Sequence, residues 1–336
     1  MVDISIKLPD RHAPAVATLL DRHRFRGTEL IPWAAVGLGF VVFPDYLVLG
    51  AQMLAMILFA LSLDLIVGYA GIVTLGHAAF FGIGGYAAGL IAIAGWGEPV
   101  TGLLAAALAA AAGGWLVGLL ILRHHGLSLL MLTLAAGYML HEAANRLTWL
   151  TGGADGLQGM VIEPLFGQFE FDLYGQTAYL YAAAVLFAGW GLLRILVHSP
   201  FGCTLVGIRD NPERMRAIGS PVFHHKLVAF TIAAGLAGAA GALMAQTSQF
   251  VSLNSLGFEL SGQVLVMLIL GGRARLYGAF CGVPFFMVAQ DRLAQSDPTY
   301  WLFWVGLLLV IVVLFAPQGL LGLIERAGRL LAWKKA

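Results

Sequence analysis

The side chains of this sequence that could bind a polar solute gather around one glycine-rich stretch, residues 68–87. Within it, Thr74 and His77 stand three residues apart and would share one face of a helix. Asp64 comes shortly before the stretch. A carboxylate, a hydroxyl and an imidazole could bind a polar or cationic group, and ionisable residues in apolar segments usually face a cavity or a partner.

The glycines of the same stretch are a second signal, because they weaken a regular helix. Residues 68–87 contain six glycines, and each costs about 1 kcal/mol relative to alanine in a helix. An unwound backbone inside lipid is tolerated only where protein or a water-filled cavity satisfies its polar groups. Such a segment therefore indicates a transport pathway, while the alternative is close packing of helices through small residues. The candidate pathway or solute-binding residues along the whole chain are Asp64, Gly71, Thr74, Gly76, His77, Thr133, Gly153 and Asp155.

Two charged sites in apolar segments have a simpler explanation. Asp64 could bind a substrate amine, but the cost of burying a lone charge favours an internal structural pair. Glu142 and Arg146 are four residues apart, so on a helix they would pair with each other.

Another motif lies in the polar segment 199–226. Asp210 or Asn211 can cap a helix whose first residue is Pro212, and Gly219 followed by Pro221 ends it. The pattern predicts a helix of about two turns between two membrane spans. It is either a docking element for a cytosolic partner or a solvated basic loop.

A third motif covers residues 261–279, where Gly271-Gly272 with Arg273 and Arg275 predicts a tight turn between two short apolar pieces. This segment partly mirrors the first glycine-rich stretch. Two broken segments, one in each half of a chain, are typical of a pseudo-symmetric transporter.

The composition indicates that most of this chain lies in a membrane. Of 336 residues, 60% are hydrophobic and 11% are charged, whereas soluble domains carry about 25% charged residues. The net charge of +1 argues against a nucleic-acid partner. The two cysteines form neither a disulfide framework nor a metal cluster.

Enzyme motifs are absent from the sequence. None of the four lysines follows a glycine, so the phosphate-binding loop of an ATPase is missing. Neither a His-Glu-x-x-His zinc motif nor a Gly-x-Ser-x-Gly nucleophile motif occurs. The sequence therefore predicts no catalytic residue, no metal site and no cofactor. If ATP drives this protein, a separate subunit must hydrolyse it.

Apolar runs of about 20 residues predict the membrane crossings. We expect ten, near 31–48, 50–69, 73–95, 99–122, 127–147, 177–197, 227–249, 258–272, 276–291 and 300–317. With both termini inside, 17 of the 19 basic residues lie on the inner side, as the positive-inside rule requires. The acidic segment 148–176 becomes an outer loop. The fold class is thus an all-α, polytopic transmembrane bundle over 31–325 with glycine-broken helices, flanked by cytosolic tails at 1–30 and 326–336.

Six motifs, in order, resemble the permease subunits of branched-chain amino acid ABC importers, specifically the LivM type. They are GYAGIVTLGHAAFFGIGGYAAG, TGGADGL, SPFGCTLVGIRDNPERMRAIG, LVAFTIAAGLAGAAGAL, GFELSGQVLVMLILGG and LFAPQGLLGL. The resemblance covers residues 45–325.

The resemblance implies a function that the residues alone left open. Such permeases translocate branched-chain or related hydrophobic amino acids across the bacterial inner membrane. Their partners are a second permease of the LivH type, two cytosolic ABC ATPase subunits and a periplasmic substrate-binding protein. Segment 207–219 matches the family's ATPase-coupling segment. The coupling residues it implies are Arg209, Asp210, Asn211, Glu213, Arg214, Arg216, Ala217 and Gly219.

The sequence departs from the family's pattern at four positions. Arg216 replaces a usually acidic residue, Gln263 and Ala274 stand where Glu and Gly are common, and Asp64 stands where Asn is common. Related permeases import urea or short-chain amides, so the resemblance does not fix the solute. An ion-coupled secondary transporter that uses Asp64, His77 or Glu142, and a membrane scaffold or sensor, are the alternatives from other classes.

Overall fold

The computed structural model describes residues 27–298 except 166 and 173, together with 300, 303, 304, 306, 307, 310, 319 and 322. The crossing expected at 300–317 and the two terminal tails lie mostly or wholly outside these residues. Within the described part, all regular structure is helical, apart from two isolated β-bridges.

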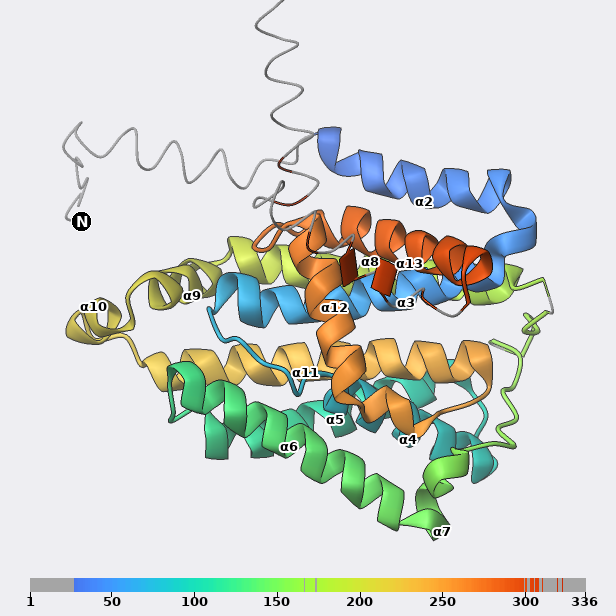
Figure 1. The fold of residues 1–336 in the computed structure, drawn as a ribbon, viewed down its shortest axis with the longest axis horizontal. Helices are drawn as coiled ribbons and strands as arrows, with labels where there is room; N and C mark the ends of the chain where they lie inside the picture. The colour runs from blue at the N-terminus through green and yellow to red at the C-terminus, as the bar shows by residue number, and fades with distance from the viewer. Residues whose placement is uncertain are drawn as a thin grey trace, which may run out of the picture.

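The helices follow one another with short connections (Figure 1). The α-helices are α2 (Ile31–Val42), α3 (Leu47–Asp64), α4 (Ala78–Ile93), α5 (Pro99–Ile121), α6 (Gly126–Arg146), α7 (Thr148–Thr151), α8 (Gln176–His198), α9 (Pro200–Asp210), α10 (Pro212–Ala217), α11 (Val222–Ser248), α12 (Phe258–Gly271) and α13 (Gly278–Ser296). A π-helix, η4 (Leu65–Tyr69), extends α3, and 3₁₀ turns occupy η2 (Gly27–Leu30), η3 (Pro44–Tyr46), η5 (Gly153–Asp155) and η6 (Leu253–Leu256).

Five helical segments of the described chain are long and apolar enough to cross a membrane. They are Pro44–Tyr69, Pro99–Ile121, Gly126–Arg146, Gln176–His198 and Val222–Ser248. These agree with five of the expected crossings, while α2, α4 and α12 are apolar but shorter. The chain is therefore an all-helical, multi-pass membrane protein, and the count of ten crossings stays a prediction.

Two expected spans differ from the observed helices. The span at 31–48 is interrupted, because Pro44 has no amide hydrogen and Phe43 before it takes a non-helical conformation (φ −123°, ψ 61°). The span at 73–95 begins as a helix only at Ala78. The expectation that Thr74 and His77 share a helical face is therefore wrong, since Thr74 lies in extended chain.

Helix α11 runs through the centre of the bundle, packed on α3, α4 and α5 (Figure 1). Small residues bring these helices together: a Cβ on Gly84 of α4 would overlap the backbone of Gly238 on α11. The sequence left open whether the glycines of the 68–87 stretch unwind the chain or allow close helix packing, and the structure shows both. Those at 82–85 pack closely against neighbouring elements, Gly71 and Gly76 belong to unwound chain, and Gly68 lies in the π-helix η4 just before it.

The connections gather at two opposite ends of the bundle. At one end, Arg209 of α9 reaches Gly68, Asp64 bonds Ala274, and Arg216 of α10 contacts His125. At the other, residue 157 pairs with 251, and 163 bonds 97. The connections expected on the inner side therefore lie together, and so do those expected outside.

Candidate functional site

The candidate site is built around an unwound segment, Ala70–His77, between η4 and α4. Helix α3 widens into the π-helix, whose last bonds run from Ala70 N to Leu65 O and from Ile72 N to Ile66 O. Gly71 then takes a left-handed conformation (φ 70°), which cannot continue a right-handed helix. Glycine adopts this conformation readily, whereas other residues rarely do. The unwinding predicted from the glycines is confirmed.

This segment interrupts the crossing that the sequence predicted at 73–95. Helix α4 has 16 residues, a length of about 24 Å, while the hydrocarbon core is about 30 Å thick. The chain reaches the start of α4 through the extended segment, which runs from the α9–α10 end into the bundle (Figure 1). Thr74, Gly76 and His77 are buried, whereas Gly71 and Val73 nearer the α9–α10 end are exposed. Neighbouring helices must satisfy the buried part of the backbone.

Helix α6 covers one side of the segment. Leu75 N lies 3.4 Å from Thr133 Oγ1, which itself donates to Leu130 O at 2.8 Å. A Cβ on Gly76 would overlap the Thr133 carbonyl, and one on Gly137 would stand 3.2 Å from Gly76 Cα. The structure thus brings Thr133 to Thr74 and Gly76, as a common site requires.

Helix α12 closes the other side through a residue to which the sequence assigned no role. Ser261 Oγ accepts a hydrogen bond from Ala78 N at 2.9 Å, so it caps the first turn of α4 from 183 residues away. The sequence could have drawn attention to Ser261 because it is the first residue of the third motif. Nothing in the local sequence, however, connects Ser261 with Ala78.

His77 is fully buried (0% exposed) and bonded within the protein. Its Nε2 lies 2.9 Å from Ser62 Oγ, and Ser62 Oγ donates to Phe59 O at 2.7 Å. The imidazole also stacks on the Phe59 ring, with centroids 5.4 Å apart. His77 therefore ties the end of the unwound segment to α3, and Ser62 is a partner that sequence reasoning missed.

Asp64 has an internal partner, as the sequence analysis favoured, and that partner is backbone. Its Oδ1 accepts from Ala274 N at 2.7 Å. Ala274 is one of two described non-glycine residues with positive φ (58°). Asp64 is buried (1% exposed). Through this hydrogen bond its side chain joins the turn after α12 to the end of α3.

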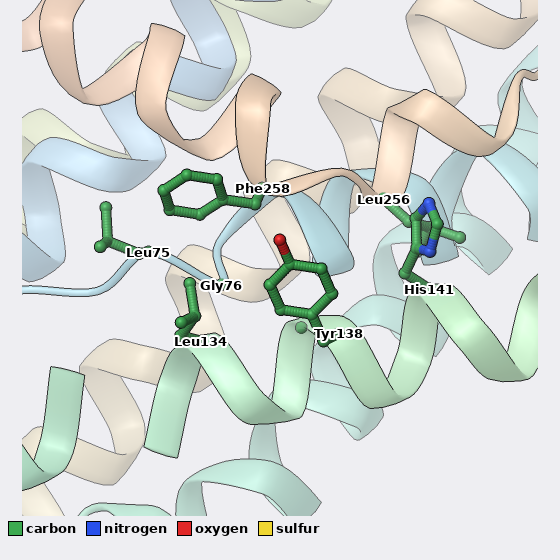
Figure 2. Close-up of a pocket in the computed structure, with 8 residues that line it drawn as sticks. Leu75, Gly76, Leu134, Tyr138, His141, Leu256 and Phe258 are labelled. Carbon is green, nitrogen blue, oxygen red and sulfur yellow. The ribbon is translucent and has the colours of Figure 1, made fainter. Parts of the chain in front are cut away.

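Small cavities flank Gly76. Figure 2 shows one, where the unwound chain lies between α6 and the start of α12, with the Tyr138 and His141 side chains on α6. Its volume is about 10 Å³, which is room for a water molecule but not for an amino acid. The lining residues are Leu75, Gly76, Leu134, Gly137, Tyr138, His141, Leu256 and Phe258. A second cavity of similar size includes Thr74 and Thr133.

The other two pathway candidates lie elsewhere. Gly153 and Asp155 form the turn η5 beyond α7, with Gly153 buried and Asp155 exposed. A Cβ on Gly153 would meet Thr148 at 2.8 Å. This turn lies against α6, α7 and η6. The expected pair Glu142–Arg146 is confirmed at 2.7 Å, on the exposed surface of α6.

The predicted short helix is present as α10. Asn211 rather than Asp210 caps it, since its Oδ1 accepts from Arg214 N at 2.9 Å. Gly219 (φ 86°) follows its end, as predicted. The segment before it is also helical, because α9 occupies Pro200–Asp210, which the sequence analysis did not foresee.

The eight coupling candidates divide by environment. Glu213 pairs with Arg216, and Arg216 also contacts His125 of the α5–α6 turn at 3.2 Å. Asp210, Arg214, Ala217 and Gly219 are exposed. Arg209 is also exposed, but it differs from these in its contact, because its guanidinium donates to Gly68 O at 2.7 Å, where the unwound segment begins.

Comparison with known proteins gives a consistent result. Residues 47–313 match the family model described as the permease component of the branched-chain amino acid transport system. The chain is 30% identical over 290 residues to the high-affinity branched-chain amino acid transport system permease protein LivM of Escherichia coli, covering 79% of this chain and 67% of that one. It is 29% identical to LivM of Salmonella typhimurium, over 85% of this chain and 72% of that one.

A more distant similarity extends to another importer. The autoinducer 2 import system permease protein LsrC of Klebsiella pneumoniae is 28% identical over 56% of this chain and 53% of its own length. No solved structure matched the chain.

Proposed function

This chain belongs to the branched-chain amino acid transport permease family. We propose that it translocates branched-chain or related hydrophobic amino acids across the inner membrane, as one of the two permease subunits of an ATP-driven importer. It is a transport subunit of an ABC importer and not an enzyme. Alternating access moves the solute: helices rock around the broken crossing, and the pathway opens first outward and then inward.

The discontinuous crossing at Ala70–His77 carries this proposal. It is a stretch of non-helical backbone inside the bundle, held by Thr133 of α6 and Ser261 of α12. Such backbone at membrane depth is tolerated where it lines a pathway. The cavities beside Gly76 are too small for a solute, and we propose that they widen during transport. The apolar lining, with Leu75, Leu256 and Phe258, suits a hydrophobic side chain better than urea or a small amide.

The proposed assembly places the power source outside this chain. The assembly contains two ATPase subunits, and the ATPase contact of this chain lies on segment 199–226, with α10 as the docking element. A second permease of the LivH type completes the pathway. A periplasmic binding protein delivers the solute to the opposite end, at 148–176. We propose ten crossings over 31–325 with both termini in the cytoplasm, because that orientation puts 17 of 19 basic residues inside.

Reconstitution tests this function. The chain is assembled with its two ATPases, second permease and binding protein in proteoliposomes, and leucine uptake is followed. We expect uptake only when ATP is present on the side of the ATPases. Vesicles with a proton or sodium gradient and no ATP form the control. Uptake in those vesicles would instead support an ion-coupled transporter.

A further inference from the structure

Arg209 is one of the residues expected to contact the ATPase, and its side chain also reaches the end of η4, where the chain begins to unwind. It stands at the end of α9, directly before the elbow at Asn211 that leads into α10. Its Nη1 donates to Gly68 O at 2.7 Å across 141 residues of sequence, and its Nη2 lies 3.1 Å from Asp210 Oδ1. One guanidinium therefore bridges the elbow and the π-helix.

The carbonyl that Arg209 binds has lost its helical partner. In an α-helix, Gly68 O would accept from Ile72 N, but Ile72 N bonds Ile66 O instead. A carbonyl at a helix C-terminus is one of the orphan acceptors, and a cation there also interacts favourably with the helix dipole. Arg209 thus replaces a bond that the unwinding removed.

The stem of Arg209 also packs on the residue where the chain unwinds. A Cβ on Gly71 would lie 2.6 Å from Arg209 Cγ and 3.2 Å from its Cα. Only a glycine fits there, both for this contact and for its φ of 70°. The elbow therefore touches the last turn of η4 and the first left-handed residue of the unwound segment at once.

We propose that Arg209 is a positioning residue that transmits movement of the α9–α10 elbow to the unwound segment Ala70–His77. When the elbow shifts, the guanidinium either carries the end of η4 with it or releases Gly68 O. In both cases the backbone beyond Gly71 rearranges. This proposal rests on the function proposed above, because the shift is imposed by the ATPase partner.

The test compares three variants in the complete reconstituted complex. Arg209→Gln removes the cation, Arg209→Lys keeps the charge with a single donor group, and Arg123→Gln is the matched control. Arg123 is an exposed arginine in the α5–α6 turn at the same end of the bundle. We expect Arg209→Gln to assemble and hydrolyse ATP within about twofold of the wild type. Leucine uptake per ATP should fall roughly tenfold, the effect of losing a charge-assisted hydrogen bond. Arg209→Lys should lose less and Arg123→Gln nothing.

A spectroscopic measurement distinguishes two roles of Arg209: transmitting movement to the unwound segment, or only stabilising its structure. A spin label is attached at position 73 in a chain that carries Val73→Cys, Cys203→Ser and Cys281→Ser. It reports on the unwound segment, where Val73 is 45% exposed. ATP should change the spectrum of the label in that chain and not after Arg209→Gln. If Arg209→Gln assembles poorly, uptake per ATP and the ATP-dependent spectrum are both measured in Arg209→Lys instead.

Each failure points to a different conclusion. Transmission would be rejected if the Arg209 variants lost uptake and ATP hydrolysis in parallel. It would also be rejected if ATP changed the spectrum of the label in these variants as much as in the chain that keeps Arg209. If the wild-type complex shows no ATP-dependent uptake, the proposed function itself is wrong. Normal uptake per ATP in Arg209→Gln beside an active wild type would reject this inference alone.

Discussion

The polar side chains around the unwound segment mostly bind backbone. Asp64 accepts from Ala274 N, Ser261 from Ala78 N, and Thr133 lies within reach of Leu75 N. Buried backbone groups that leave a helix need such partners, because an unsatisfied group costs about 1–3 kcal/mol. These residues therefore maintain the shape of the break, which is a different task from binding the solute.

Asp64 gives the clearest test at this scale. Asp64→Asn keeps an oxygen that can accept from Ala274 N, so we expect uptake and thermal stability close to those of the wild type. Asp64→Leu leaves that amide unsatisfied and should destabilise the protein by about 1–3 kcal/mol. Thermal unfolding in detergent and uptake assays measure both. If Asp64→Asn abolished uptake while leaving stability intact, the charge of Asp64 would have a direct transport role.

Gly76 tests the close approach of the unwound segment to α6. A Cβ there would overlap the Thr133 carbonyl, so Gly76→Ala should cost about 1–3 kcal/mol through overpacking and reduce uptake. Gly262→Ala on α12 is the matched control, since nothing lies within 4 Å of a Cβ at that position. Its melting temperature should be unchanged or slightly raised. Equal melting temperatures for the two variants would contradict the packing seen here.

At the scale of elements, the α9–α10 elbow is defined by its capping residues. Ser199 caps α9 by accepting from Gly202 N, and Asn211 caps α10 by accepting from Arg214 N. Helix α10 has only six residues, and isolated helices of that length are not stable in water. Its cap and its packing against α9 therefore maintain it, so the cap of Asn211 is one of the two supports of the proposed docking element.

Replacing Asn211, which is both the cap of α10 and one of the expected coupling residues, tests how far the helix depends on that cap. Asn211→Ala should destabilise α10 by about 0.5–2 kcal/mol, the usual cost of losing a cap. Faster hydrogen exchange of the amides at 215–218 would report this, together with weaker retention of the ATPase. Asn211→Asp is the control, because its carboxylate can accept the same bond. Equal exchange in all three proteins would show that α10 does not need its cap.

At the scale of the whole molecule, the connections divide between two ends. Arg209, Arg216 and Ala274 belong to connections at one end, and the 148–176 loop packs on 97 and 251 at the other. Opposite ends of a membrane protein face different compartments, and basic residues favour the cytoplasmic one. The charge pattern therefore predicts the orientation of the entire bundle.

Labelling of single cysteines in intact cells tests that orientation. In a Cys203→Ser, Cys281→Ser chain, a cysteine replacing the exposed Asp155 should react with a membrane-impermeant maleimide. A cysteine replacing the exposed Arg123 should react only after the cells are permeabilised. Both positions are exposed and neither lies in a long helix interior, so reactivity reports the side of the membrane. The reverse pattern would overturn the proposed topology.

The sequence alone determined the properties that depend on composition and on neighbouring residues. Its apolar runs predicted five helices that are observed as candidate spans. The glycines before Ala78 predicted the unwound segment. Asp210 or Asn211 as the cap, Pro212 as the first residue and Gly219 after the end predicted α10, and the structure selects Asn211. Each of these follows from short-range physics: lipid solvation, helix propensity and capping act over a few residues.

Only the tertiary structure decided how the polar residues pair. Asp64 meets Ala274 across 210 residues, Ala78 meets Ser261 across 183, and Gly68 meets Arg209 across 141. It also separated Thr74 from His77 as helical neighbours and left Gly153 and Asp155 at the far end of the bundle. A buried hydrogen bond needs two groups that packing brings within about 3 Å of each other. Which distant helices pack together depends on how their side chains fit along the whole fold, and local sequence does not encode that fit.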